Sequence, residues 1–493
     1  MPSVAISPAG NMSIFHCSGV TQVLLRFTAQ SGAKLVWTIF DNTVIVMKPL
    51  LKKILFWGLV IDIAIAALIV AVNLPVFDQK IDPLLSSVLT HPTDLKFENN
   101  AFILMVGFAA PDTEDHLHIS YELAKARYQS DFLGRNPEDN ANWQQAVQID
   151  RQWSENLPQL NCVSRKDPTC IGQLADSLGN ILDANARLAL LINRYQNLLE
   201  VSALDESAVQ DWQDPLPDYG LITKVANIYR ASLLRSGDIN QLVDFIQQDT
   251  QFWRMVLKDS QLIVGKMVAA SHLATLALLV NQLLYDGMLT SDQITLLESS
   301  LQTLSLSELD ISNAVLAEHL VAQRLGLYLF NGVPKGPVQS ALHKGFSQRV
   351  ATQNDYFRYV TLPLLNILTL NSSDFFEQYN SFTVTYTKFG ITPAVIYNPV
   401  GKYIVSESIE SQQEVFPYSA RVRDLDGLLR LLCIHFAVHS GEDLLQTIAR
   451  EQFSNPYTQK PMDYDPSGQR IFFECLSKNF FECTIHVRYS EIN

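Results

Sequence analysis

An apolar stretch near the N-terminus constrains this chain more than any other feature. Ile54–Val72 holds nineteen residues with one charge, Asp62, and as a helix it would cross the roughly 30 Å hydrocarbon core of a membrane. Lys48, Lys52 and Lys53 precede the stretch, and flanking positive residues stay on the cytoplasmic side. We therefore expect one transmembrane helix, a cytoplasmic N-terminus and an exported C-terminal part.

A cleaved signal peptide is the alternative to an anchor. Its apolar region runs about 7–15 residues and ends in a small-x-small cleavage site, whereas this stretch is longer and Ala71-Val72-Asn73 is a poor site. An uncleaved anchor is favoured. Asp62 is a candidate functional carboxylate, because a charge in the span costs about 2.5–3.5 kcal/mol. Contact with another membrane protein and simple tolerance in a very apolar helix are both open.

Residues 1–46 have no sustained period of 3.6 or 2. Met47 begins MKPLLKK, a charged segment ahead of an apolar one. We interpret 1–46 as an N-terminal extension with a doubtful start site, and a genuine cytosolic tail is the alternative. The predicted organisation beyond it is an anchor with its basic flank at 47–77, a connector and edge segment at 78–114, a helical domain at 115–374, and an α+β part ending in a hairpin at 375–493.

The exported part is acidic. Residues 78–493 hold 31 Lys and Arg against 48 Asp and Glu, a net charge of −17. Nucleic acid needs a basic footprint, so a nucleic-acid partner is not expected. A hydrophobic share of 47% allows a sizeable core.

Four of the six cysteines form two short-range pairs. Cys162 and Cys170 are eight residues apart, and so are Cys475 and Cys483. In an oxidising periplasm such spacings close small disulfide loops, whereas in a cytosol they are more often free thiols or ligands. The orientation of the anchor favours two disulfides.

Helical periodicity dominates the exported part. The predicted helices are Asp115–Leu133, Pro137–Leu157, Cys170–Glu200, Tyr219–Arg235, Asp238–Lys258, Gln261–Tyr285, a helix capped by Ser307 and Asp310 and running to Phe330, Leu425–His439 and Glu442–Phe453. Asn99–Pro111 reads as a strand or a short helix at the domain edge. Gln261–Tyr285 is apolar enough to be weighed as a second span, but its uncharged core is short and a buried core helix is favoured.

The pattern changes past Phe375. Phe382–Thr387 and Tyr403–Ser406 favour strands by their β-branched and aromatic content. FFEC occurs at 472–475 and again at 480–483, so a terminal hairpin is predicted over Arg470–Val487. A loop centred on Asn479 would place Cys475 opposite Cys483. The fold class is therefore mainly α, with one membrane helix, a multi-helix periplasmic domain and a small C-terminal β-hairpin.

Several short motifs together resemble those of a group of proteobacterial membrane-anchored helical envelope proteins that are uncharacterised. The motifs are the anchor, NNAFILMVGFAAP at 99–111, NPVGK at 398–402, and NPYT at 455–458 followed by Lys460-Pro461 and the hairpin. The resemblance covers residues 47 to about 485. It implies a bacterial inner-membrane location and no activity at any position.

The best metal-like cluster is Cys433, His435, His439 and Glu442. His435 and His439 are four residues apart, the spacing at which paired imidazoles hold zinc on a helix. Phe436 stands where HExxH has its general base, however, and a histidine in a last helical turn also relieves the helix dipole. A helix end is favoured over a metal site. His116 and His118, amid acidic residues, are a weaker candidate.

Two turn-rich segments are candidates for ligand binding. Asn455, Pro456, Tyr457 and Lys460 are interpreted as a structural turn, with a binding loop as the alternative. Asp463 and Asp465 offer oxygen ligands suited to calcium, although aspartates are common in turns for local hydrogen bonding.

No catalytic residue is predicted, because the sequence contains no GxSxG, P-loop or GxGxxG motif. No cofactor is expected. The leading hypothesis is a non-enzymatic interaction or envelope-assembly protein that contacts the membrane through one helix and binds an envelope protein. The alternative is a periplasmic hydrolase or lyase with dispersed active-site residues. Oligomeric state, substrate and partner stay undetermined by the sequence.

Overall fold

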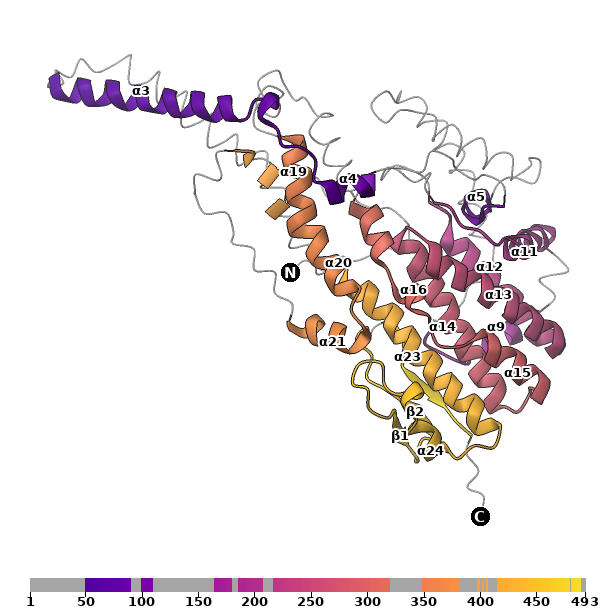
Figure 1. Ribbon diagram of the computed structural model, residues 1–493. Helices are drawn as coiled ribbons and strands as arrows, with labels where there is room; N and C mark the ends of the chain where they lie inside the picture. The colour runs from indigo at the N-terminus through magenta and orange to yellow at the C-terminus, as the bar shows by residue number, and fades with distance from the viewer. Residues whose placement is uncertain are drawn as a thin grey trace. The chain divides into compact units, whose positions relative to one another are not determined.

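The computed structural model describes residues 49–89, 99–109, 164–179, 185–206, 216–319, 348–381, 397–399, 401–402, 405–406, 415–478 and 480–488. These residues are mainly helical, with a small antiparallel sheet near the C-terminus (Figure 1). The chain divides into two compact units, Met1–Ile69 and Val70–Asn493. The prediction of a mainly helical fold with a small C-terminal β element is confirmed.

Two described helices are long and apolar enough to cross a membrane. One is α3 (Pro49–Val72), which contains the predicted anchor and has exposed side chains over most of its length. The other is α14 (Ile263–Tyr285), which is mostly buried inside the fold. A buried helix of this kind is typical of a globular core, as predicted for this segment.

Short elements follow α3 before the helical core begins. They are η2 (Pro75–Phe77), α4 (Pro83–Leu89) and α5 (Ala101–Val106). Asn100 caps α5 by accepting a hydrogen bond from the Phe102 amide and also forms a β-bridge to Ala203. The short-helix interpretation of the Asn99–Pro111 segment is therefore confirmed.

The helical core is built around α14. It packs against α13 (Ile239–Asp259) and α23 (Phe416–His439), α13 packs against α12 (Tyr219–Ser236) and α15 (Ser291–Ser300), and α12 packs against two outer helices (Figure 1). The other described helices are α9 (Cys170–Ser177), α11 (Ala186–Leu199), α16 (Leu306–Leu309), α19 (Arg349–Tyr356), η3 (Phe357–Thr361, a π-helix), α20 (Leu362–Leu368), α21 (Ser372–Ser381), α24 (Leu444–Ile448) and η6 (Glu451–Phe453).

Local capping residues set the ends of α12 and α13 close to the predicted boundaries. Asp218 and Asp238 cap the two helices by accepting hydrogen bonds from the amides of Leu221 and Gln241. Gly237 lies between the helices in the left-handed conformation, with φ 72°, which glycine adopts without strain. The predicted helices over Tyr219–Arg235 and Asp238–Lys258 are confirmed.

The continuous helix predicted over Cys170–Glu200 is wrong. In its described part the segment contains α9 and α11 as separate helices, and α9 ends at Ser177. Gly179 follows with φ 53°, a left-handed conformation that ends a helix. Asn185 then starts α11 by accepting from the Leu188 amide. The apolar stripe spans both helices, and periodicity alone did not reveal the break.

Two further helix predictions need correction. The cap near 307 is formed by Ser305 and Glu308 as a capping box, not by Ser307 and Asp310, and α16 is only one turn long. The chain is helical again over 312–319, within the predicted helix. The helix predicted over Glu442–Phe453 is the short α24, followed by the 3-10 turn η6. In the opposite direction, α23 begins at Phe416, nine residues before the predicted start, with Pro417 in its first turn.

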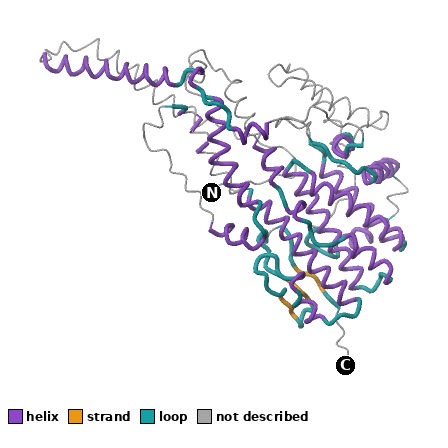
Figure 2. Tube along the Cα trace, in the orientation of Figure 1, coloured by secondary structure: helices purple, strands orange, loops and turns teal. Residues whose placement is uncertain are grey.

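The C-terminal sheet has three short antiparallel strands, β1 (Asp463–Asp465), β2 (Arg470–Phe472) and β3 (Thr484–His486), in the order β1-β2-β3 (Figure 2). The predicted hairpin is β2–β3, to which β1 adds a strand. Ile471 pairs with Ile485, so the hairpin is centred on Lys478 rather than Asn479. Cys475 and Cys483 are therefore diagonal, not opposite, and they are bonded with Cα atoms 5.8 Å apart.

Other predictions fall wholly or partly outside the described residues. These are the extension 1–46, the helices Asp115–Leu133 and Pro137–Leu157, the part of the capped helix beyond His319, His116 and His118, the strand Phe382–Thr387, and Cys162. Cys170 takes part in a disulfide. Val405 and Ser406 are helical, so a strand over Tyr403–Ser406 does not extend through them.

Candidate functional site

The candidate metal cluster of Cys433, His435, His439 and Glu442 is not assembled. His435 is buried in α23, and its Nδ1 lies 2.7 Å from Oδ1 of Asn281. His439 is exposed at the end of α23, and Glu442 pairs with Arg450 at 2.8 Å. Burial lowers the pKa of His435 to about 3. Among the described residues, the one set of three metal-ligand atoms within 4.8 Å of one another is Asp424, Cys475 and Cys483, and both of its sulfurs are in the disulfide.

The polar groups of the Asn455–Lys460 turn form hydrogen bonds within the turn and with the core. Asn455 Oδ1 accepts from the amides of Tyr457 and Thr458, at 2.9 and 3.3 Å, and the Asn455 amide donates to Lys460 O. Tyr457 points into the core and donates to Asp424 Oδ1 at 2.6 Å. Lys460 and Pro456 belong to the same turn, and Lys460 is exposed. These contacts give the turn a structural role.

Asp463 and Asp465, the candidate calcium ligands, have different surroundings. Asp465 accepts from the Ser467 and Gly468 amides and pairs with Arg470 at 2.9 Å. Asp463 begins β1 and is exposed. The Asp465 carboxylate is thus the acceptor that closes the β1–β2 turn.

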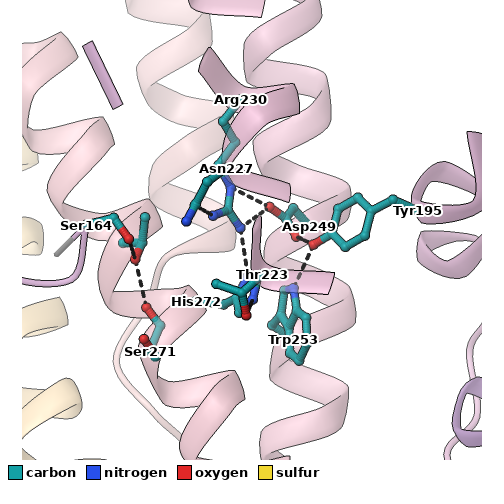
Figure 3. Close-up of polar contacts among 10 residues, drawn as sticks. Ser164, Tyr195, Thr223, Asn227, Arg230, Asp249, Trp253, Ser271 and His272 are labelled. Carbon is teal, nitrogen blue, oxygen red and sulfur yellow. Dashed lines mark hydrogen bonds and ion pairs between the residues drawn. The ribbon is translucent and has the colours of Figure 1, made fainter. Parts of the chain in front are cut away.

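The densest polar cluster lies elsewhere, in the middle of the helical core (Figure 3). Its central pair is Arg230 of α12 and Asp249 of α13, joined through both Nε and Nη2 at 2.9 and 2.6 Å. Tyr195 of α11 donates to the other carboxylate oxygen at 2.6 Å. His272 of α14 accepts at Nδ1 from Arg230 at 2.9 Å. Side chains from four helices thus meet in this buried network.

The network fixes the protonation of its histidine. Burial, reinforced by the Arg230 charge, holds the pKa of His272 well below its usual range, so the ring is neutral. Because Nδ1 accepts from Arg230, Nε2 carries the proton and donates to Thr223 Oγ1, 3.0 Å away. Trp253 stacks on the ring with centroids 4.0 Å apart.

Burial also raises the pKa of Tyr195 well above its usual value, with the Asp249 charge acting in the same direction. Tyr195 therefore stays protonated and donates to Asp249 while accepting from Trp253 Nε1 at 2.9 Å. Tyr195, Arg230 and Asp249 have no exposed surface, and His272 is 1% exposed. A substrate in solution cannot reach these groups, so the network orients helices rather than performing chemistry.

A second buried carboxylate joins α23 to the C-terminal sheet. Asp424 accepts from the Leu476 and Ser477 amides, at 3.0 and 2.8 Å, as well as from Tyr457. Burial raises the pKa of Asp424 to about 6 despite these donors. The two amides follow Cys475 directly, so the disulfide and Asp424 together hold one loop of the sheet.

The third polar cluster holds the segment that follows α3. We call it the junction clasp: the contacts of residues 73–82 with residues 348–358 and 397–402. Asp78 accepts from the amides of Val350 and Ala351, at 2.8 and 2.9 Å, at the start of α19. Asn354 accepts from the Asp82 amide and donates to Lys80 O.

The NPVGK motif forms the other side of the junction clasp. The Asn398 amide donates to Asn73 Oδ1 at 2.7 Å, and Asn398 Oδ1 accepts from the Gln348 amide at 3.0 Å. Asn398 is buried with φ 53°, a conformation that asparagine tolerates better than most residues. A side chain at Gly401 would overlap those of Thr352 and Asn398. The motif is therefore explained by close packing against the segment that follows α3.

Sequence reasoning missed the buried network and Asp424. Arg230, Asp249, His272 and Asp424 each interrupt an apolar helical pattern, and a charged residue on a buried face has to be paired. That signal marks each residue, but it does not identify the partners.

Comparison with protein-family models, with curated proteins and with solved structures finds no match to this chain.

Proposed function

We propose that this protein is a single-pass inner-membrane protein whose large C-terminal unit lies in the periplasm and serves as a non-enzymatic interaction or assembly partner in the envelope. The observation that carries the proposal is α3. Its 24 residues measure about 36 Å at 1.5 Å per residue, enough for the roughly 30 Å core. Its large apolar side chains are exposed, Ile54 to 59% and Trp57 to 60%.

Lysines at one end of α3 support the orientation. Lys48, Lys52 and Lys53 lie at or before its start, and Asp78 and Asp82 follow its end, which favours a cytoplasmic N-terminus. The disulfide pair Cys475–Cys483 fits an oxidising compartment. The resemblance to helical envelope proteins agrees with the same location.

The interaction role is favoured over the hydrolase or lyase alternative by the placement of the titratable groups. An active site needs perturbed groups that converge on an accessible pocket. In the part of the chain that the structure describes, the groups that converge around Asp249 and around Asp424 are buried and bonded to one another. They stabilise helix and sheet packing, which is what a rigid binding platform requires.

A topology experiment tests the proposal. Alkaline phosphatase fused after residue 90 should be active, because the enzyme folds only after export, and a cytosolic reporter fused at the same site should be inactive. Exchanging Lys48, Lys52 and Lys53 for Glu should lower phosphatase activity by weakening the positive flank. An inactive phosphatase fusion paired with an active cytosolic reporter would refute the orientation.

A further inference from the structure

The segment directly after α3 exposes apolar side chains although it is firmly attached to its own unit. Val76 is 80% exposed, Phe77 58% and Leu84 60%, and Leu74 is 44% exposed. The backbone that carries them is held by the junction clasp, through Asp78 and Asp82. The exposed side chains therefore belong to an ordered surface.

The surface continues onto α19 and η3. Asp82 pairs with Arg358 at 2.8 Å, which ties the segment that carries the exposed Ile81 and Leu84 to η3, where Tyr359 is also exposed. The Tyr397 hydroxyl donates to Phe77 O at 3.1 Å. We call this set the junction patch: Leu74, Val76, Phe77, Ile81, Leu84 and Tyr359.

Exposed basic side chains lie beside the junction patch in a chain that is acidic overall. The Asp78 carboxylate accepts hydrogen bonds from backbone amides, and the Asp82 carboxylate accepts from the Arg358 guanidinium, all within the same unit. Lys80 and Arg349 are exposed beside them. Apolar and aromatic side chains mixed with lysine and arginine are the composition found at membrane–water interfaces.

If α3 spans the membrane, chain connectivity limits how far the junction patch can lie from the membrane surface. Val76 is four residues after Val72, the last residue of α3, and four extended residues reach about 14 Å at most. The polar headgroup zone adds roughly 5–8 Å on each side of the hydrocarbon core. Val76 thus lies in the headgroup zone or within about 9 Å of its outer edge.

From this we infer that the junction patch is a lipid-binding surface, which rests the C-terminal unit on the outer leaflet of the membrane that α3 crosses, with Lys80 and Arg349 facing anionic headgroups. The inference rests on the proposed function, since it needs α3 in the membrane. It adds a second membrane contact, made by the folded unit itself.

Depth-dependent quenching in the full-length protein tests the inference. The chain is reconstituted into nanodiscs of phosphatidylcholine and phosphatidylglycerol, with a genetically encoded fluorescent amino acid at position 76, 84 or 445. Leu445 is 64% exposed and lies in α24, at the other end of the C-terminal unit from α4 and α19 (Figure 1). Brominated lipids should quench the probes at 76 and 84 and leave the probe at 445 unchanged.

Substitutions separate the patch from the anchor. Val76→Asp with Phe77→Asp should abolish quenching at 84, and Leu445→Asp should not alter it. Because these side chains are exposed, their replacement leaves the fold intact, which circular dichroism checks. Lys80→Glu with Arg349→Glu should remove any gain in quenching that phosphatidylglycerol gives over phosphatidylcholine alone.

Resistance to alkaline carbonate extraction distinguishes the two possible failures. If the protein resists extraction but the probe at 76 is not quenched, the junction patch faces water or protein and the inference is overturned while the anchor stands. If the protein is extracted, α3 does not span the membrane and the proposed function fails with the inference.

Discussion

At the scale of single residues, buried charges carry the most specific information in this fold. Arg230 and Asp249 are fully buried, and their three other hydrogen-bond partners, Tyr195, Asn227 and His272, are neutral. Replacing a whole buried pair with apolar residues is often harmless, whereas removing one partner leaves an uncompensated charge. The pair therefore specifies how α11, α12, α13 and α14 are placed more than it adds to stability.

Asp249→Asn tests that reasoning. The substitution leaves Arg230 buried without a countercharge and should lower the free energy of unfolding by about 3–5 kcal/mol, measured by urea denaturation in detergent. Asp259→Asn is the matched control, because the Lys258–Asp259 pair is long, at 4.0 Å, and exposed. Its effect should stay below about 1 kcal/mol. Equal effects of the two substitutions would contradict the importance of the buried pair.

At the scale of elements, α23 connects the helical core to the C-terminal sheet. One face packs on α14 and the other meets β3 and the loop after β2. Gly427 lies at this contact, in the middle of the helix, where the Phe473 ring occupies the place of a side chain. The absence of a Cβ thus allows the sheet to approach α23.

Gly427→Ala should therefore destabilise the protein by about 1–3 kcal/mol through overpacking, although alanine favours helices by about 1 kcal/mol over glycine. Gly172→Ala in α9 is the control, since nothing lies within 4 Å of its Cβ position, and it should be neutral or stabilising. Adding Phe473→Leu to Gly427→Ala should recover part of the loss. Thermal unfolding by circular dichroism compares the three variants.

The Cys475–Cys483 disulfide should act on the sheet alone. Its loop is short, with a sequence separation of 8, so chain entropy accounts for about 2–3 kcal/mol. Cys475→Ser with Cys483→Ser should speed hydrogen exchange and proteolysis at 463–487 and leave α12–α14 protected. Thiol labelling of denatured, unreduced wild-type protein should modify neither cysteine. Labelling of both would disprove the bond and leave the hairpin held by packing and by Asp424.

At the scale of the whole molecule, local sequence patterns were sufficient to predict most of the long helices. The packing of these helices depends on contacts between residues that are distant in sequence. Periodicity predicted α12 and α13 because that signal is local, and their ends are also set locally, by Asp218, Gly237 and Asp238. The break at Gly179 was missed since the apolar stripe runs on across it. The Asn73–Asn398 contact joins residues 325 apart in sequence, and no pattern in a single sequence encodes such a pairing.

The last prediction concerns that long-range contact. Asn398→Ala removes the acceptor of the Gln348 amide and places a residue that disfavours positive φ in a left-handed position. Hydrogen exchange followed by mass spectrometry should become faster in residues 73–89 and 348–358, with α14 unchanged. Asn398→Gly keeps the backbone conformation and loses the side-chain acceptor, so its effect should have the same location and be smaller.

Asn371→Ala provides the matched control. Asn371 caps α21 by accepting from the Asp374 amide at 2.9 Å, and it lies outside the junction clasp. Its loss should cost about 1 kcal/mol and change exchange only around 371–381. If Asn398→Ala leaves residues 73–89 as protected as in the wild type, the NPVGK motif does not hold the segment that follows α3. The contacts of Asp78, Asp82 and Asn354 with α19 and η3 would then be sufficient to hold that segment.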